Sequence, residues 1–176
     1  EIDKPLYQHI EQIGEAGAVA SYQACSKAID KLAYIAMKVR SHSGFRKKNS
    51  LYFAAFKKDM DWLRKEYNTR AQYGFPVKWL SPGAITEAYG IHNTYGGILS
   101  AQGGSMDAFR LAHDILVYNI SKGLRVYDKT DTIDIAYKKS GVVVTTEYGN
   151  TIRAGKLIYC NGYESTEIIK DNFVKL

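Results

Sequence analysis

The sequence predicts an α+β protein, with helices packed on a mixed, largely antiparallel β-sheet and with a β-hairpin and a returning strand added near the end. Three observations support this prediction. Helical patterns separated by short extended runs fill the first half of the chain. One long helical pattern then stands between strand patterns, and two β-branched runs separated by a turn follow it. The chain contains no internal repeat and no low-complexity linker.

Composition is that of an ordinary globular protein. The chain has 176 residues, of which 45% are hydrophobic and 24% are charged. This length suffices for one large domain or two small ones with a real core. No apolar run has the length of a membrane span, and no signal-peptide pattern opens the chain. The chain starts at Glu1 rather than Met, which suggests a processed or excised piece.

The positive charge lies in the first half of the chain. Residues 1–80 contain 14 Lys or Arg against 8 Asp or Glu, whereas residues 81–176 contain 10 of each. The densest basic point is Arg46-Lys47-Lys48. A basic half suggests binding to a polyanion. A solvated basic face is the preferred interpretation, because the charges spread over several helices without a nucleic-acid motif.

Two helices are expected at the start. The first covers residues 5–13. Asp3 and Pro5 are its start signals, and Gly14 is its stop signal. From Glu15 a helix of about six turns follows. Its apolar stripe recurs near every 3.6 residues and consists of Val19, Tyr22, Ser26, Ile29, Leu32 and Val39, with Ile35 alongside. Lys27, Lys31 and Lys38 fall largely off the stripe, so this helix is expected to face the core.

Three more helices are expected. Lys57 begins one that ends at Tyr73-Gly74, and Ser81-Pro82 begins another that Gly90 closes. Asp107 caps the third, which ends at Lys122-Gly123.

Short extended runs supply the strands. The ranges expected as strands are 50–55, 77–80, 96–102, 124–127, 132–137, 142–147 and 151–154. Two glycine pairs, Gly96-Gly97 and Gly103-Gly104, bound the third range and are interpreted as structural turns. Tyr148-Gly149-Asn150 is a turn signal between the last two strands. Leu157–Cys160 is expected to be a buried strand that ends at Asn161-Gly162, where a ligand would bind.

Several site classes lack support in the sequence. The four histidines are scattered without metal-ligand spacing, and neither a Gly-x-Ser-x-Gly elbow nor a Walker loop occurs. No Gly-x-Gly-x-x-Gly segment follows a strand, so the chain lacks the dinucleotide fingerprint. Cys25 and Cys160 stand in apolar patterns and are expected to be reduced, buried thiols, which fits a cytoplasmic protein. No metal site is expected, and the catalytic residues stay unknown.

The hairpin followed by Thr-Ile-Arg-Ala-x-Lys-Leu-Ile at 151–158, with Gly162-Tyr163 and Ser165, resembles the D-amino-acid oxidase and glycine oxidase family of FAD-dependent oxidoreductases. Cys160-Asn161-Gly162 stands where that family has Ala-Thr-Gly. Earlier matching segments are Glu1–Leu6, Ser50–Ala54, Gly96–Ser100, Gly104-x-x-Asp107-x-x-Arg110-Leu111 and Gly123-Leu124-x-Val126 through Thr132. Ala108 replaces the usual proline.

The resemblance implies a division of the chain. Residues 1–122 would form the helical and sheet substrate-binding domain of a flavin oxidase. Residues 123–165 would be a hairpin and strand of its FAD-binding domain, and residues 166–176 a tail. In this scheme Thr132 offers a main-chain group to the adenine ring, and Cys160, Asn161 and Gly162 form the turn near the cofactor. Tyr52 lies on the sheet that roofs the substrate pocket, where its phenol binds a substrate carboxylate or is buried in the sheet core.

The implied function is that of the middle fragment of an FAD-dependent enzyme that oxidises a small amino acid or 2-hydroxy acid by hydride transfer to flavin. The fragment alone is expected to be inactive and not to retain FAD. No nucleic-acid partner and no membrane span are expected, and the oligomeric state stays open. The alternative is a free-standing basic module that binds an anionic partner.

Overall fold

The structure, a computed structural model, describes residues 2–162. The chain divides into two compact units, Glu1–Leu124 and Arg125–Leu176, which are described separately. The first unit contains all the helices of the described residues, and the second contains a small sheet. Within the described part of the chain no helix has the length and apolarity needed to cross a membrane. The α+β prediction is confirmed.

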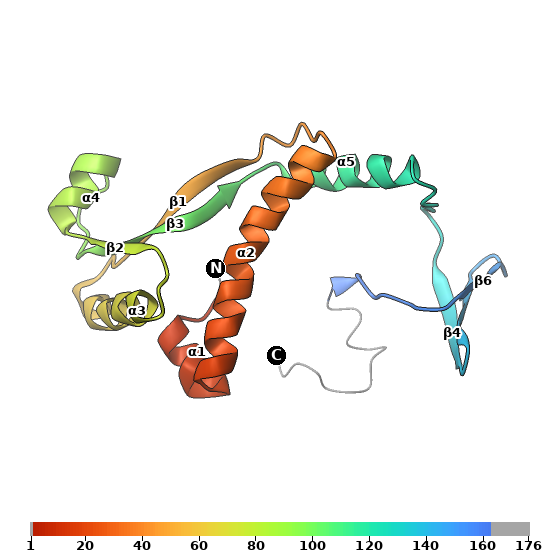
Figure 1. The fold of residues 1–176 in the computed structure, drawn as a ribbon, viewed down its shortest axis with the longest axis horizontal. Helices are drawn as coiled ribbons and strands as arrows, with labels where there is room; N and C mark the ends of the chain where they lie inside the picture. The colour runs from red at the N-terminus through yellow and green to blue at the C-terminus, as the bar shows by residue number, and fades with distance from the viewer. Residues whose placement is uncertain (1, 163–176) are drawn as a thin grey trace. The chain divides into compact units, whose positions relative to one another are not determined.

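The first unit begins with α1 (Leu6–Ile13) and α2 (Glu15–Lys38), both close to their expected bounds. Figure 1 shows the two helices joined at a sharp corner. Gly14 forms this corner with a φ of 84°, a backbone angle that glycine adopts without strain. Leu6, Ala18 and Tyr22 are buried there, and Phe75 packs against them. The Lys residues of α2 are exposed as expected.

A three-stranded antiparallel sheet follows, in the order β1-β3-β2 (Figure 1). Its strands are β1 (Arg46–Phe53), β2 (Val77–Leu80) and β3 (Gly97–Ser105). β1 starts four residues before the expected strand, because its pairing with β3 continues through Arg46, Lys47 and Lys48. Charged side chains suit this stretch since β1 is an edge strand and they reach solvent.

The second glycine pair lies inside β3, so the prediction that it forms a turn is wrong. Gly103 pairs with Lys48, and the next pair is Ser50 with Ser100. β3 therefore carries one residue more than β1 at this point, which is a β-bulge. A Cβ on Gly103 would lie 2.5 Å from the main-chain oxygen of Lys48, so close backbone approach requires glycine.

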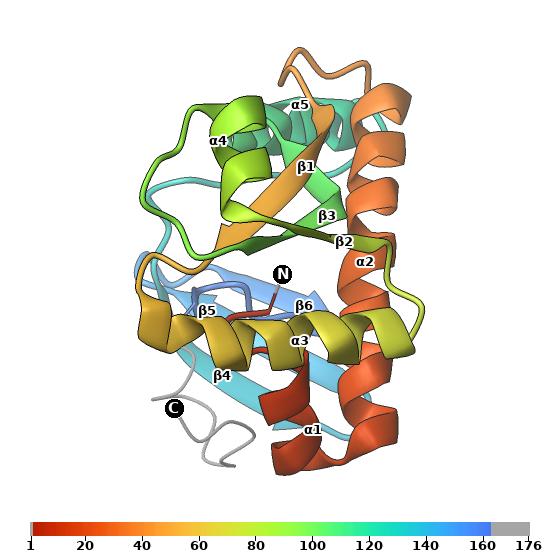
Figure 2. The same ribbon diagram turned by 90° about the vertical axis from the view of Figure 1, so that its left-hand side faces the viewer.

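Helix α3 (Met60–Gln72), preceded by a short 3₁₀ turn η1 (Lys57–Asp59), packs on one face of this sheet. Leu63 of the helix is fully buried with Ala54 and Ile98 of the sheet region, and Trp62, Tyr67 and Trp79 surround them. Complete burial of a side chain such as Leu63 contributes roughly 2 kcal/mol. Figure 2 shows α3 running across the direction of α2.

Two capped helices complete the unit. In α4 (Pro82–Tyr89) the Ser81 Oγ accepts a hydrogen bond from the Ala84 N–H at 3.2 Å, and Gly90 is left-handed. In α5 (Ala108–Ile120) the Asp107 Oδ1 accepts from the Arg110 N–H at 2.9 Å. Both caps agree with the expected start signals.

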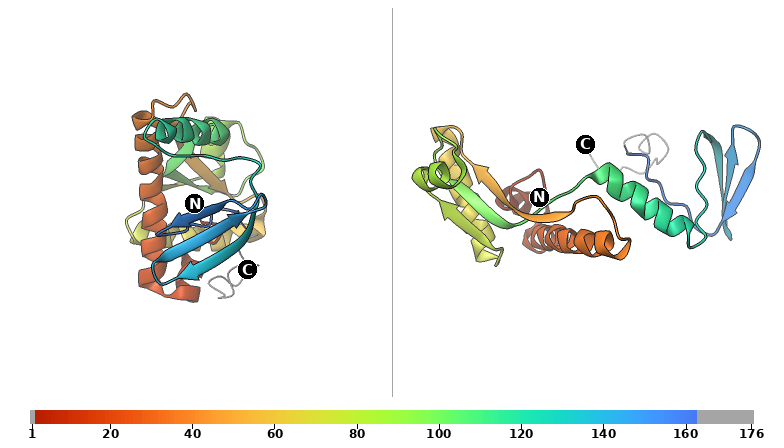
Figure 3. Two further views of the ribbon diagram at one scale, coloured as in Figure 1. Left: turned by 90° about the vertical axis from the view of Figure 1, so that its right-hand side faces the viewer. Right: turned by 90° about the horizontal axis from the view of Figure 1, so that it is seen from above.

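The second unit contains the predicted hairpin. β4 (Thr132–Lys138), β5 (Gly141–Thr146) and β6 (Thr151–Ala154) form an antiparallel sheet in the order β4-β5-β6, and Figure 3 shows them side by side. Val142, Val144 and Thr146 of the central strand are buried. The strand expected at 124–127 is absent: Leu124, Val126 and Tyr127 are exposed and pair with no strand of the described residues.

Candidate functional site

A large concavity lies in the second unit, beside β4. Its volume is about 1130 Å³, somewhat above the usual range of ligand-binding sites. Three of the four residues predicted to bind the cofactor line it, namely Thr132, Cys160 and Asn161. We call this feature the β4 concavity. Its other lining residues are Thr130, Asp131, Ile133, Asp134, Ile135, Tyr137, Val144, Leu157, Ile158 and Tyr159.

Thr132 lies at the start of an edge strand. β4 pairs with β5 on one side, and no strand of the described residues pairs with its other side. Main-chain groups along that side therefore point outward, as a ring-binding main-chain contact requires. The register shifts between Thr132 and Asp134, and the Ile133 side chain between them is exposed. Such irregularities are common beside binding sites.

Ile135, Tyr137 and Val144 place one face of the sheet against the β4 concavity. Directly paired residues of antiparallel strands project to the same side of a sheet. Val144 pairs with Ile135 and Ile152, and Val142 pairs with Tyr137, so these five side chains share one face. Thr130, Asp131 and Asn161 add polar groups to the lining. The lining is thus a nearly even mixture of polar and apolar surface, which offers contacts to an aromatic ring and to polar substituents on it.

The far wall of the β4 concavity is the segment 157–161. The prediction that Leu157–Cys160 forms a buried strand is wrong, because these residues are in no strand and Ile158 is 81% exposed. An extended run becomes a strand only when a neighbouring strand completes its hydrogen bonds. β6 ends at Ala154, and no strand of the described residues pairs with the 157–160 run. Cys160 is exposed rather than buried. Cys25 is half-buried, and both thiols are free.

Gly162 ends the described part of the chain. Its φ of 61° lies in the left-handed region, so a glycine is favoured at this turn. Gly162 is adjacent to Asn161 but does not line the β4 concavity. Of the four predicted cofactor residues, three therefore line the β4 concavity, and the fourth, Gly162, lies in the adjoining turn.

A tyrosine pair joins the two walls. The phenol oxygens of Tyr137 on β4 and Tyr159 on the 157–161 segment are 2.5 Å apart, which is a short hydrogen bond. This hydrogen bond, with burial as the second cause, raises the pKa of Tyr159 above its ordinary value. Sequence reasoning missed both residues, because no spacing rule relates positions 137 and 159 before the segment is placed.

Tyr52, the predicted substrate residue, lies in the first unit. Its ring centroid is 5.6 Å from that of Trp62, and its side chain shares the α3 face of the sheet with Ile98, with which it pairs. The side chain is 37% exposed, so it is not enclosed in the sheet core. Tyr52 borders a pocket of about 240 Å³ together with Asp3, Ser50 and Arg70, among others.

A buried ion pair in α3 was also missed. Glu66 is fully buried, and Arg70 one turn later is 4% exposed. Glu66 Oε1 accepts hydrogen bonds from Arg70 Nε at 2.6 Å and from the Leu6 N–H at 2.8 Å, and Oε2 accepts from the Tyr7 N–H at 3.2 Å. The carboxylate thus caps the N-terminus of α1. The Glu-Arg spacing of four residues was visible in the sequence, but its burial was not.

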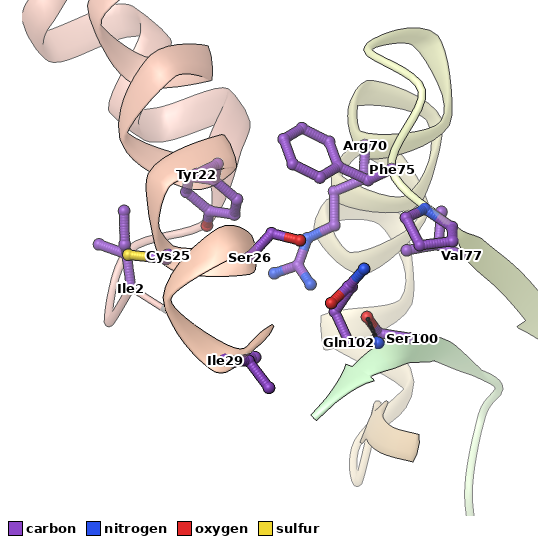
Figure 4. Close-up of a pocket in the computed structure, with 11 residues that line it drawn as sticks. Ile2, Tyr22, Cys25, Ser26, Ile29, Arg70, Phe75, Val77, Ser100 and Gln102 are labelled. Atoms are coloured by element: carbon purple, nitrogen blue, oxygen red, sulfur yellow. Dashed lines mark hydrogen bonds between the residues drawn. The ribbon is translucent and has the colours of Figure 1, made fainter. Parts of the chain in front are cut away.

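Arg70 also borders a cavity between α2, α3 and β3. Figure 4 shows its guanidinium directed toward Ser26 of α2 and Gln102 of β3. The cavity measures about 40 Å³, which is room for very few water molecules. Among the residues the structure describes, no group of three or more His, Cys, Asp or Glu is arranged to hold a metal ion.

The comparisons with known proteins identify the family. A model of the family described as FAD dependent oxidoreductase matches residues 6–175. The chain belongs to this family. No curated protein matches it in sequence.

Solved structures of similar fold include proteins whose titles name a glycine oxidase, an L-proline dehydrogenase and an L-amino acid deaminase. A glycine oxidase from Geobacillus kaustophilus superposes with a TM-score of 0.67 at 22% identity, covering 88% of this chain and 39% of that one. An L-proline dehydrogenase from P. horikoshii gives 0.66 at 15% identity, covering 80% and 38%. An L-amino acid deaminase from Proteus myxofaciens gives 0.60 at 14% identity, covering 73% and 30%. The chain therefore spans about two-fifths or less of these proteins.

The β4 concavity fits one part of the FAD that the family binds. It offers the outward main chain of an edge strand, an apolar face for a ring, and the polar side chains of Thr132 and Asn161. The pyrophosphate needs a glycine-rich turn at a helix N-terminus, and the chain contains no such segment. The features of the β4 concavity would therefore suit the adenine-bearing end of FAD rather than its pyrophosphate.

Proposed function

We propose that this chain is the substrate-binding middle part, with a portion of the cofactor domain, of an FAD-dependent oxidoreductase that oxidises a small amino acid or 2-hydroxy acid. The match of the family model to residues 6–175 carries the proposal. The coverage of about two-fifths of the glycine oxidase and proline dehydrogenase chains supports the fragment interpretation.

In this proposal residues 1–122 bind substrate and residues 123–165 belong to the FAD-binding domain. The division into units at residues 124 and 125 is consistent with this scheme. The tail expected at 166–176 lies outside the described residues.

The cofactor residues of the proposal are Thr132, Cys160, Asn161 and Gly162. Thr132 would offer main-chain groups along the β4 edge, and the left-handed turn at Gly162 would let the main chain approach the cofactor closely. Bound flavin supplies the redox chemistry by accepting a hydride from the substrate carbon. The isolated chain is not expected to retain FAD, since it has no glycine-rich phosphate turn.

The first unit would orient the substrate and exclude water. In this proposal the Tyr52 phenol donates a hydrogen bond to a substrate carboxylate, an assignment favoured by its partial exposure at a pocket. The titles of the similar structures name glycine oxidase, proline dehydrogenase and amino acid deaminase, which favours an amino acid over a hydroxy acid. No residue of the chain is assigned a catalytic proton transfer.

No observation on the described residues specifically favours the alternative, a free-standing basic module that binds an anionic partner. Lys47, in the densest basic run, pairs with Asp30, and Lys65 pairs with Glu11 at 3.0 Å. A cytoplasmic location and the absence of a nucleic-acid partner stay predictions from the sequence.

The test starts with the reading frame around this chain. We expect a β-strand, a Gly-x-Gly-x-x-Gly turn and a helix upstream of Glu1. The complete gene product should carry flavin absorbance, which amino acids should bleach under anaerobic conditions. A start codon directly before Glu1, or a complete product without flavin, would contradict the proposal. In parallel, titration of the 176-residue chain with FAD should give no tight binding.

A further inference from the structure

The wall of the β4 concavity formed by the 157–161 segment has little regular structure to hold it. The segment belongs to no strand, and its lining residues Leu157 and Tyr159 are half-buried whereas Ile158 and Cys160 are exposed. A segment without ladder hydrogen bonds depends on side-chain contacts for its position. Cys160 and Asn161, two of the proposed cofactor residues, lie in this wall.

The opposite wall is regular. Tyr137 lies one residue before the end of β4 and pairs with Val142 of the central strand. Thr132 is five residues earlier in the same strand, which corresponds to roughly 17 Å of extended chain. The ladder with β5 fixes Tyr137 and Thr132 relative to each other. A contact between Tyr137 and the 157–161 segment therefore also fixes the position of that segment relative to Thr132.

The hydrogen bond between Tyr137 and Tyr159 is such a contact. Their phenol oxygens lie 2.5 Å apart, and both residues line the β4 concavity. Tyr159 immediately precedes Cys160, so fixing its phenol restricts the next two residues as well. We propose that Tyr137 and Tyr159 are positioning residues, whose hydrogen bond holds the 157–161 segment across from β4 and thereby raises the affinity of the site for FAD. This inference rests on the proposed function, because it assigns the tyrosine pair a role in the same cofactor site.

The expected size of the effect follows from the kind of interaction. A hydrogen bond between neutral groups in a partly exposed position changes a binding constant by about three- to tenfold. Loss of either hydroxyl removes the same hydrogen bond. FAD binding should therefore weaken by the same factor in Tyr137→Phe, in Tyr159→Phe and in the double variant. If the two tyrosines made independent contacts, the factor for the double variant would be the product of the two single factors.

The first measurement uses the complete gene product. The apoprotein is titrated with FAD, and the dissociation constant is followed by quenching of flavin fluorescence. Tyr148→Phe is the matched control, because this tyrosine lies in the turn after β5, is 73% exposed and does not line the β4 concavity. We expect the control to bind FAD as the unchanged protein does, and its melting temperature to match those of the pair variants.

The second measurement uses the 176-residue chain without flavin. Tyrosine labelled with ¹³C at the ζ carbon reports each phenol ionisation by NMR, and the signal lost in Tyr159→Phe identifies Tyr159. The pKa of Tyr159 should lie above the ordinary value near 10 and return toward it in Tyr137→Phe. A merely space-filling tyrosine would show no such response.

The outcomes separate the two hypotheses. FAD affinities of the pair variants equal to that of Tyr148→Phe would overturn the role of the pair and leave the flavoprotein function standing. A loss of FAD affinity in the double variant equal to the product of the two single losses would also overturn it. So would a pKa of Tyr159 that does not change in Tyr137→Phe. A complete gene product that binds no FAD in any variant would refute the proposed function itself, and with it the role of the pair.

Discussion

At the scale of single residues, Glu66 is a fully buried carboxylate with three hydrogen bonds. Its carboxylate satisfies Arg70 and two main-chain N–H groups that α1 cannot satisfy within itself. A buried charge pair is not in itself strong evidence of stability, because desolvation opposes the attraction. Removing one partner is costly, however, since the other charge then stays buried without compensation.

Glu66→Gln should therefore destabilise the first unit by about 3 kcal/mol, because the amide leaves the Arg70 charge unpaired. Urea unfolding followed by circular dichroism measures this free energy. Glu11→Gln is the control: Glu11 pairs with Lys65 at the surface, where both side chains are more than half exposed. Its loss should cost at most about 0.5 kcal/mol. Equal stabilities of the two variants would refute the buried-cap interpretation.

The close approach of β3 to β1 gives a second residue-scale prediction. Gly103→Ala should lower the free energy of unfolding by about 1–3 kcal/mol, because the new Cβ meets the Lys48 carbonyl at 2.5 Å. Gly83→Ala in α4 is the control, since a Cβ there meets no atom within 4 Å. It should leave stability unchanged or raise it by roughly 0.5 kcal/mol. A tolerated Gly103→Ala would show that the bulge relaxes freely.

At the scale of elements, the Asp114 carboxylate attaches α5 to the loop before β1, alongside the hydrogen bond from the N–H of its N-cap Asp107 to the Ser43 main-chain oxygen. Asp114 Oδ2 accepts hydrogen bonds from the Ser41 hydroxyl at 2.7 Å and from the His42 N–H at 3.0 Å. The Ser41 hydrogen bond is the largest cause that lowers the pKa of Asp114, and burial opposes it. The His42 N–H and the Arg110 charge lower this pKa further. Ionised Asp114 is thus expected to hold α5 against this loop more strongly than protonated Asp114 does.

The pH dependence follows from the sign of this shift. A folded-state pKa below the unfolded value means that the carboxylate contributes stability above the unfolded pKa, roughly 3.9, and loses it as the pH falls through the folded pKa. The difference in unfolding free energy between the unchanged chain and Asp114→Asn should be constant above about pH 5 and shrink in more acidic solution. Urea unfolding at several pH values measures it. In Ser41→Ala the pKa of Asp114, followed by NMR, should rise toward its ordinary value; a pH-independent difference would contradict the account.

At the scale of the whole molecule, the two units differ in what sustains them. The first has two buried clusters, around Leu6 and around Leu63. Within its described residues the second has one three-stranded sheet, near the lower limit for independent stability. The first unit is therefore expected to fold without the second.

A chain of residues 1–124 should keep the helical circular dichroism signal and a cooperative unfolding transition. A chain of residues 1–106 is the control. It lacks α5, and with it buried Leu111 and the Asp114 hydrogen bonds to the loop before β1. It should unfold at a lower urea concentration. Loss of the cooperative transition in the 1–124 chain would show that the units depend on each other.

Local signals in the sequence sufficed for most elements. The caps at Ser81 and Asp107, the corner at Gly14 and the hairpin from β4 to β5 rest on contacts within a few residues, so sequence reasoning places them correctly. The family resemblance, carried by short motifs in order, is confirmed by the match over residues 6–175. Thr132, Cys160 and Asn161 were all proposed from those motifs, and they line one concavity.

Contacts between distant residues were decided only by the tertiary structure. Leu157–Cys160 has the composition of a strand, but a strand also needs a neighbour, and composition does not show whether one is present. The burial of Glu66 depends on where α1 docks, sixty residues away in sequence. The tyrosine pair likewise forms only once the 157–161 segment returns to β4. The sequence by itself thus determined most of the elements and the family, and the tertiary structure decided which side chains meet, because such contacts depend on long-range packing.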